Sequence, residues 1–328
     1  MILRPKSLRH APVAITSTGP VAPAAPVPTW LRVAAAGPES LEDAAFAAAA
    51  ALTVLDTVVR RRERWAGAWR QRLALTAAAV TAKRAGRVED EAALRDTLLL
   101  TRPGDDVGPA GRMLLAWRKL VSRPVESLLA EGALADVSAD LGDAVDEEAT
   151  VDLGDAIRPI AGAHRNAVAA AAASIEAIER YGHRSGRDLG PWLGDAVLAD
   201  RLGWPLALPL LGIHPAASGS RSSPAEPKQS HTSRERILAA CARAALQAVD
   251  LSAELGRRAD RLLAVAPKLR AKGSNAVVEK LLADDAVVAS QDVPGMSDRG
   301  LRRLFDRLVD LGAVRELSGR ATFRIYGL

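Results

Sequence analysis

The sequence is poor in cysteine, histidine and aromatic residues. Its single cysteine, Cys241, excludes an intrachain disulfide framework, and the five histidines show none of the Cys/His spacings that bind zinc. We therefore expect no metal, no cofactor and a reducing, cytoplasmic compartment.

Long hydrophobic runs are also missing. The most apolar stretch, AAFAAAAALTVLDTVV, is mostly alanine, contains Asp56 and ends just before RRRER, so it is too short and too weakly hydrophobic to span a bilayer. Prolines at 12, 20, 23, 26 and 28 break up any apolar h-region near the start, so we expect no signal peptide there. We expect no membrane partner, and we interpret residues 1–38 as a flexible Pro/Ala-rich tail.

Most of the apolar residues in this chain are small or aliphatic, with alanine especially abundant. Apolar residues make up 48% of the chain, enough for a sizeable core, and alanine both favours helix and lets helices approach closely. The sequence therefore predicts a mainly α protein, with an all-α body over residues 39–213. Within it we expect a helix from about 41 to 61 with Ser40 as its N-cap, a long helix over 155–182 started or kinked at Pro159, and tryptophans in the core.

A long helix follows a break in the body. Residues 214–232 are rich in Ser, Pro and Gly and predict a linker or exposed loop, after which 233–267 forms one helix about 50 Å long. An apolar seam between residues 237 and 265 follows a spacing of four and three, interrupted at Arg258. It can pack on the chain's own N-terminal helices, or it can join two copies in a homodimer.

Charge is segregated along the chain. No Lys or Arg lies between Arg123 and Arg158, where ten carboxylates fall, whereas residues 234–272 hold nine basic residues against four acidic ones. Two interpretations remain open: two solvated faces that lie against each other, or a basic partner-binding surface in the C-terminal third.

The C-terminal segment 268–328 predicts a winged-helix-like domain with a small β-hairpin. NAVVEKLLADD suits a first helix and AVVAS a first strand. A helix capped by Ser297 then has Leu301, Leu304, Phe305, Leu308 and Leu311 on one face. Gly312 suits the helix end, and AVREL and ATFRIYG flank a turn at SGR. Only QDVPGM lies between the first strand and Ser297, which leaves little room for the middle helix of a helix-turn-helix.

Basic residues of this segment are our candidate site. On the helix and hairpin we expect a nucleic-acid interface, with Arg299, Arg302 and Arg303 near base edges and the hairpin arginine at phosphate; the full set is Arg299, Arg302, Arg303, Arg307, Arg320 and Arg324. Asp306 and Asp310 on the same face would repel phosphate unless paired. We therefore expect a double-stranded DNA partner, or alternatively a protein that docks at the same face in a larger complex.

An enzyme is the remaining class. The stretch TRPGDDVGPAGR gathers Arg102, Asp105, Asp106 and Arg112 before a helix start, where a phosphate or a metal could bind. It matches neither a P-loop nor a dinucleotide-binding turn, and its simplest interpretation is an inter-helix turn tied by Arg–Asp pairs. We assign no catalytic residue and expect a non-enzymatic protein.

Three stretches carry a family resemblance. AGRVEDEAALRDTLLLTRPGDDVGPAGRMLLAWRKL, LLAVAPKLRAKG and LRRLFDRLVDLGAVRELSGRATFRIYGL closely resemble the bacterial family catalogued as domain of unknown function 1403. The resemblance covers most of the chain from about residue 40. Because that family is uncharacterised, the resemblance implies no activity and no site residues.

Overall fold

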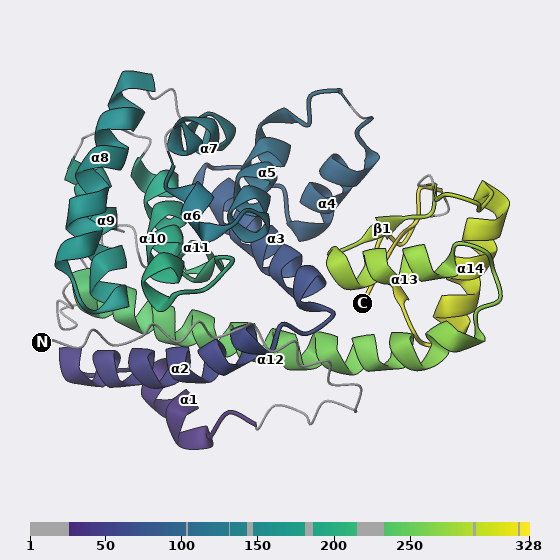
Figure 1. The fold of residues 1–328 in the computed structure, drawn as a ribbon, viewed down its shortest axis with the longest axis horizontal. Helices are drawn as coiled ribbons and strands as arrows, with labels where there is room; N and C mark the ends of the chain where they lie inside the picture. Colours follow the sequence, from purple (N-terminus) through teal and green to yellow (C-terminus); the bar gives the residue numbers. More distant parts are fainter. Residues whose placement is uncertain are drawn as a thin grey trace, which may run out of the picture.

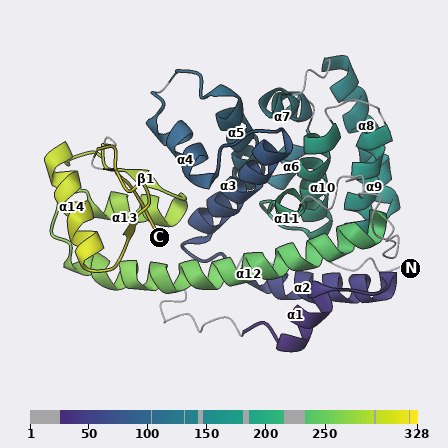
Figure 2. The ribbon, with the colours of Figure 1, turned by 180° about the vertical axis from the view of Figure 1, so that it is seen from behind.

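The computed structural model describes residues 26–328 except 103, 131, 143–146, 181–185, 215–232, 291–292 and 321. These residues form fourteen α-helices and three short strands, which confirms the predicted mainly α class. The longest helix, α12 (Ser233–Val265), runs along the molecule, with the helical body over most of its length and a C-terminal module at one end (Figures 1 and 2). No helix in the described part of the chain is long and apolar enough to cross a membrane.

The body contains the first eleven helices. They are α1 (Thr29–Ala36), α2 (Leu41–Arg61), α3 (Ala66–Arg84), α4 (Glu91–Leu100), α5 (Gly108–Ser122), α6 (Val125–Leu128), α7 (Ala133–Leu141), α8 (Glu147–Ala163), α9 (Ala167–Arg180), α10 (Gly186–Leu202) and α11 (Leu210–Ile213). Helix α2 has the predicted bounds, and the Ser40 hydroxyl accepts a hydrogen bond from the Asp43 amide at 3.1 Å.

Two sequence predictions for the body are wrong. Helix α1 lies inside the segment 1–38 that we expected to be a flexible tail. Its contacts with the body hold it in place: Leu31 and Ala35 are buried, and Arg32 forms an ion pair with Asp250 of α12 at 2.7 Å. The long helix expected over 155–182 is divided into α8 and α9: Pro159 lies inside α8, and the Asn166 side chain accepts hydrogen bonds from the first amides of α9. Residues 1–25 of the predicted tail and residues 215–232 of the predicted linker 214–232 lie outside the described residues.

Small residues let α12 pack closely on the body. Helix α12 packs most extensively against α2, where alanines of both helices are fully buried, including Ala47 and Ala51 of α2 and Ala244 and Ala248 of α12. The apolar seam predicted for this helix is therefore covered by the chain's own helices over most of its length. Burial raises the pKa of Cys241 in this seam to about 12, with Asp195 as a second cause, so the thiol is an inert core group at neutral pH.

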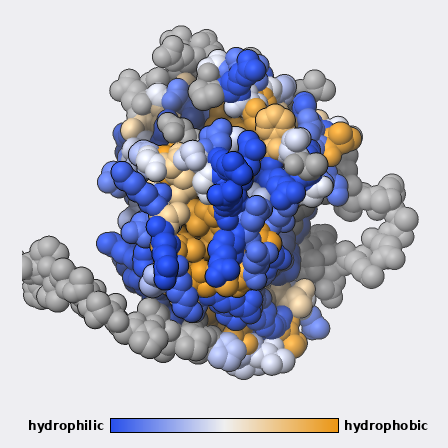
Figure 3. Space-filling model, turned by 90° about the vertical axis from the view of Figure 1, so that its right-hand side faces the viewer, coloured by the Kyte–Doolittle hydropathy of each residue, from blue (hydrophilic) through white to orange (hydrophobic). Residues whose placement is uncertain are grey.

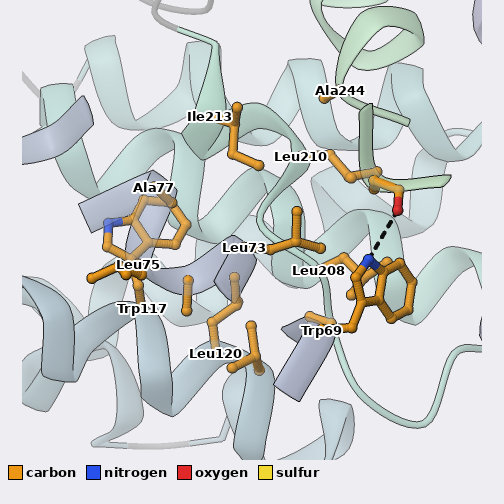
Figure 4. Packing of buried hydrophobic residues seen from close by; sticks show 14 of the residues in the cluster. Trp69, Leu73, Leu75, Ala77, Trp117, Leu120, Leu208, Leu210, Ile213 and Ala244 are labelled. Carbon is orange, nitrogen blue, oxygen red and sulfur yellow. Dashed lines mark hydrogen bonds between the residues drawn. The ribbon is translucent and has the colours of Figure 1, made fainter. Parts of the chain in front are cut away.

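Tryptophans fill the body core as predicted. The Trp69 indole donates a hydrogen bond to the Ala248 carbonyl at 2.9 Å, and the Trp117 indole donates one to Thr81 Oγ1 at the same distance. Figure 4 shows the two rings with Leu73 between them. Since the indole N–H groups of Trp69 and Trp117 both have partners, these two rings are buried without the cost of an unsatisfied donor.

The C-terminal module combines two helices with a three-stranded sheet. After a 3-10 turn (Ala266–Lys268) come α13 (Ser274–Ala283), β1 (Val287–Val288), α14 (Asp298–Asp310), β2 (Arg315–Glu316) and β3 (Ile325–Gly327). The strands lie in the order β1-β3-β2 and pair antiparallel, with Val288 opposite Ile325 and Glu316 opposite Tyr326. Among the described residues between β1 and α14 no helix forms, and Pro294 and Gly295 make a turn instead.

Helix α14 begins and ends where its sequence predicts. The Ser297 hydroxyl accepts a hydrogen bond from the Gly300 amide at 3.2 Å, and Gly312 adopts the left-handed conformation just after the helix, at φ +62°. Phe305 is fully buried and stacks on Tyr326 with ring centroids 4.3 Å apart. Regular strand alternation would place Phe323 on the same face as the buried Ile325. Phe323 is instead 64% exposed, with φ +55°.

Candidate nucleic-acid interface

The outer face of α14 carries four of the six predicted site residues. Because Leu301, Leu304, Phe305 and Leu308 turn inward, the helical period places the remaining positions in solvent. Exposed arginines occupy this outer face at positions 299, 302, 303 and 307, and none of them forms an ion pair within the described residues.

Carboxylates lie between these arginines. Asp306 is 3.7 Å from Arg324 of the hairpin, which also lies 3.8 Å from Glu316. Arg324 is therefore shared between two acids, and it neutralises the carboxylate that would otherwise repel phosphate in the middle of α14. Asp298 and Asp310 stand at the two ends of the helix, so the turn that carries Arg302 and Arg303 has the most positive surroundings.

Arg320 at the hairpin tip is not part of this surface. Its guanidinium pairs with Asp96 of α4, in the body. Beside this pair, Leu99, Leu100 and Leu317 pack on a small cluster of Ala286, Val288 and Ile325. The hairpin thus lies against the body, and the structure does not bring its tip together with the arginines of α14.

Further ion pairs hold the module to the body at the start of β1. The buried carboxylate of Asp285 accepts hydrogen bonds from Arg72 of α3 and, at 2.6 Å, from Arg95 of α4, while the neighbouring Asp284 pairs with Arg118 of α5. We call Arg72, Arg95, Arg118, Asp284 and Asp285 the junction cluster. Here Gly67 of α3 meets Ala283: a methyl group at Gly67 would lie 2.5 Å from the Ala283 carbonyl oxygen.

The two junction carboxylates have opposite pKa shifts. Burial alone would raise the pKa of Asp285, but the two guanidiniums beside it bring that pKa below its ordinary value. At Asp284 burial is the largest cause, and it raises the pKa in spite of Arg118. Asp285 is therefore the anion that the junction stabilises.

A second basic segment lies beside the start of α14. The connection between α12 and α13 passes next to the Pro294–Gly295 turn: a methyl group at Gly295 would lie 3.3 Å from Lys272 Cε, and one at Gly273 would lie 3.2 Å from the Pro294 carbonyl oxygen. Lys268, Arg270 and Lys272 of this connection are exposed and form no ion pair within the described residues.

These two segments together make one basic face. We define it by the exposed cations of the connection and of the first turns of α14: Lys268, Arg270, Lys272, Arg299, Arg302 and Arg303. Figure 3 looks onto this end of the molecule, where hydrophilic side chains surround a narrow hydrophobic strip. The sequence held the signal for the first three residues, since no acid occurs between Asp260 and Glu279, but nothing in it placed them beside α14.

The loop considered for an enzyme site is a turn between α4 and α5. The Asp106 carboxylate accepts hydrogen bonds from the Gly108 amide at 3.0 Å and from the Arg112 guanidinium at 3.2 Å, and all these groups lie near the surface. Arg102 and Asp105 are exposed, and no group of three or more metal-ligating side chains occurs in the part of the chain that the structure describes. The interactions of Asp106 account for the loop as a structural turn.

Comparison with known protein families identifies a family whose description names no activity. A family model described as "Protein of unknown function (DUF1403)" matches residues 17–328, which extends the resemblance seen from about residue 40 toward the start of the chain. No curated protein matches the sequence.

Proposed function

Since the chain belongs to the family of proteins of unknown function DUF1403, whose description assigns no activity, we propose from its own surface that it binds duplex nucleic acid through the C-terminal module. It acts without catalysis, as a binding or regulatory protein. We place it in the cytoplasm, the compartment that a single, unpaired cysteine favours.

The basic face carries this proposal. Lysine and arginine side chains that neutralise phosphates release counterions from the duplex, and this supplies most sequence-independent affinity. Six exposed cations without a carboxylate partner among the described residues are available for such contacts, whereas each arginine of the junction cluster already contacts an aspartate. The cations of the basic face therefore stabilise no ion pair within the described chain, and their charge is available to a partner.

The topology of the module supports a winged-helix-like mode of binding. A sheet in the order β1-β3-β2 beside an exposed amphipathic helix is the arrangement in which α14 would enter the major groove with its N-terminal turns. Because the hairpin tip lies on α4, the connection at Lys268, Arg270 and Lys272 takes the place of a wing at the phosphate backbone. Helix α14 would then contact base edges and the connection would contact phosphate.

A salt series on labelled duplex DNA tests the proposal. We expect fluorescence anisotropy to report binding that weakens steeply as salt rises. The triple variant K268A/R270A/K272A should bind more weakly, with a salt slope reduced by about three. A matched variant, K83A/R102A/R165A, removes the same charge from exposed positions of the body and should keep the wild-type affinity. Equal losses in both variants, or no binding by wild type at low salt, would refute the proposal.

Protein docking is the second candidate function, and one observation favours it. Phe323 is exposed in a backbone conformation that costs a non-glycine residue free energy, next to a pocket of about 440 Å³ lined by Arg302, Asp306 and Arg324. Exposed aromatic side chains are common anchors in protein interfaces. If wild type binds no duplex, this surface becomes the leading candidate, and Phe323→Ala should then weaken capture of a partner in a larger complex.

A further inference from the structure

A pocket of about 490 Å³ lies where three parts of the chain meet. Its lining comes from the end of α2, the α2–α3 turn and the start of α3, from the segment Pro205–Leu208 after α10, and from Ala283 at the end of α13. The volume falls in the range of roughly 300–1,000 Å³ that is typical of small-molecule sites. None of the residues assigned to the basic face lines this pocket.

One guanidinium in the pocket lacks a partner. Arg70 is partly buried and forms neither a hydrogen bond nor an ion pair within the described residues, and burial lowers its pKa. A desolvated cation without a counterion costs free energy unless a ligand supplies the anion. The pocket is therefore lined by a partly buried cation that has no counterion among the described residues.

A second guanidinium lines the same pocket. Arg62 ends α2 in the left-handed conformation at φ +49° and is exposed without an ion pair within the described residues. Arg64, by contrast, is paired with Glu279 at 2.5 Å. Arg62 and Arg70 are thus the two cations of the pocket that remain available.

The start of α3 adds to the positive character of the site. Gly67, in its first turn, lines the pocket, and no side chain caps this helix end. Uncapped amides at a helix start favour an anion, and guanidiniums bind phosphate oxygens in paired hydrogen bonds. The two features reinforce each other, because both lie in one pocket.

The rest of the lining suits an organic ligand. Pro205, Leu206 and Leu208 form an apolar wall, and Glu63 supplies a carboxylate whose pKa burial raises. A carboxylate next to a phosphate site can accept hydrogen bonds from sugar hydroxyls, while an apolar wall covers a flat ring. From these groups together we infer that the pocket binds a small organic phosphate of nucleotide size, with its phosphate on Arg62 and Arg70.

Binding of adenosine monophosphate, inorganic phosphate and adenosine to the full chain tests this inference by calorimetry and thermal melting. We expect the nucleotide to bind and to raise the melting temperature, inorganic phosphate to bind more weakly, and adenosine not to bind. Failure of both phosphate compounds to produce heat would overturn the inference.

Two variants separate ligand binding from a structural role. Arg70→Met keeps the aliphatic stem and removes an unpaired charge, so the ligand-free protein should melt at the wild-type temperature or above, while nucleotide affinity falls by at least about tenfold. Arg62→Gly places glycine where φ is positive, so it should also fold, and it should weaken binding in the same way.

Arg243→Met is the matched control. Arg243 is another half-buried arginine with a pKa lowered by burial, but it does not line the pocket, so its replacement should leave nucleotide binding unchanged. If Arg70→Met instead lowers the melting temperature of the ligand-free protein and keeps wild-type affinity, Arg70 is structural and the inference fails. Duplex binding should be unchanged in Arg70→Met, so this result and the test of the basic face are independent.

Discussion

Two sets of arginines in this protein have opposite surroundings. Those of the junction cluster each face an aspartate across the boundary between body and module, and the most buried of these acids, Asp285, serves two guanidiniums at once. Those of the basic face stand in solvent on α14 and on the connection before α13, without an ion pair within the described residues. Arginines of the junction cluster thus hold the module against the body, whereas arginines of the basic face are available to a partner.

This difference shows that arginine content alone does not identify a binding surface. Arg320 was a candidate for phosphate contact because it lies at a hairpin tip, yet it pairs with Asp96, 224 residues away in sequence. What distinguishes the two sets is whether the fold supplies a carboxylate.

The largest effect is expected at Asp285. Replacing it by alanine leaves Arg72 and Arg95 buried without a counterion, which should cost about 3–5 kcal/mol of unfolding free energy. Urea denaturation followed by circular dichroism measures this loss. Asp284→Ala is the neighbouring control: its side chain is 41% exposed and faces a single arginine, so the loss should stay near or below about 1 kcal/mol. Equal losses at the two positions would contradict the role given to Asp285.

The junction should also give a pH dependence of known sign. Because the folded-state pKa of Asp285 is below its ordinary value of 3.8, its contribution is fully present above that pH and is lost as the pH falls further. The free-energy difference between wild type and Asp285→Asn should therefore shrink below about pH 3.8. Asp284 has the opposite sign, since a raised pKa makes its ionisation unfavourable for folding as the pH rises above 3.8. Urea midpoints from pH 3 to 7 for wild type, Asp285→Asn and Asp284→Asn would reveal both trends.

A smaller effect is expected on binding at the basic face. The double variant R302A/R303A should lose about 1–3 kcal/mol of binding free energy per base contact on a preferred duplex, and its preference over a scrambled duplex should flatten. Its unfolding free energy should match wild type, because both side chains are exposed and unpaired within the described residues. Anisotropy with selected and scrambled duplexes measures the first effect, and urea denaturation the second. A loss of stability without a loss of affinity would assign these arginines to the fold.

The smallest effect is expected at Arg320. Its pair with Asp96 is half-exposed, so Arg320→Ala should cost only about 0.2–1 kcal/mol of unfolding free energy. Because the hairpin tip lies on α4, the variant should bind duplex DNA with wild-type affinity and an unchanged salt slope. A salt slope reduced by about one would mean that the tip leaves α4 and contacts phosphate.

Local features of the fold could be predicted from the sequence. Ser40, Ser297 and Gly312 mark helix ends through interactions with residues three or four positions away, and the inward face of α14 follows from its period. The order of helix, strand, helix and hairpin in the module was predicted for the same reason. Such signals need no knowledge of distant parts of the chain.

Contacts between distant residues could not be predicted. Helix α1 depends on burial of Leu31 and on Asp250 of α12, so its own sequence looks like a proline-rich tail. Likewise, only the folded chain brings Lys272 next to Gly295 and makes one basic face out of two segments. The candidate site was therefore half predicted: the arginines of α14 were named, while the connection at Lys268, Arg270 and Lys272 was not joined to them.

The contact of Gly67 with Ala283 has an evolutionary consequence. No side chain fits at position 67 while the end of α13 stays where it is, so natural selection should reject every replacement in chains that keep the module docked on the body. Chains that have lost this glycine should also have lost Asp285 or its two arginines, because the restraint and the ion pairs serve the same docking. Position 67 would then mark, among related sequences, those in which body and module evolve as one unit.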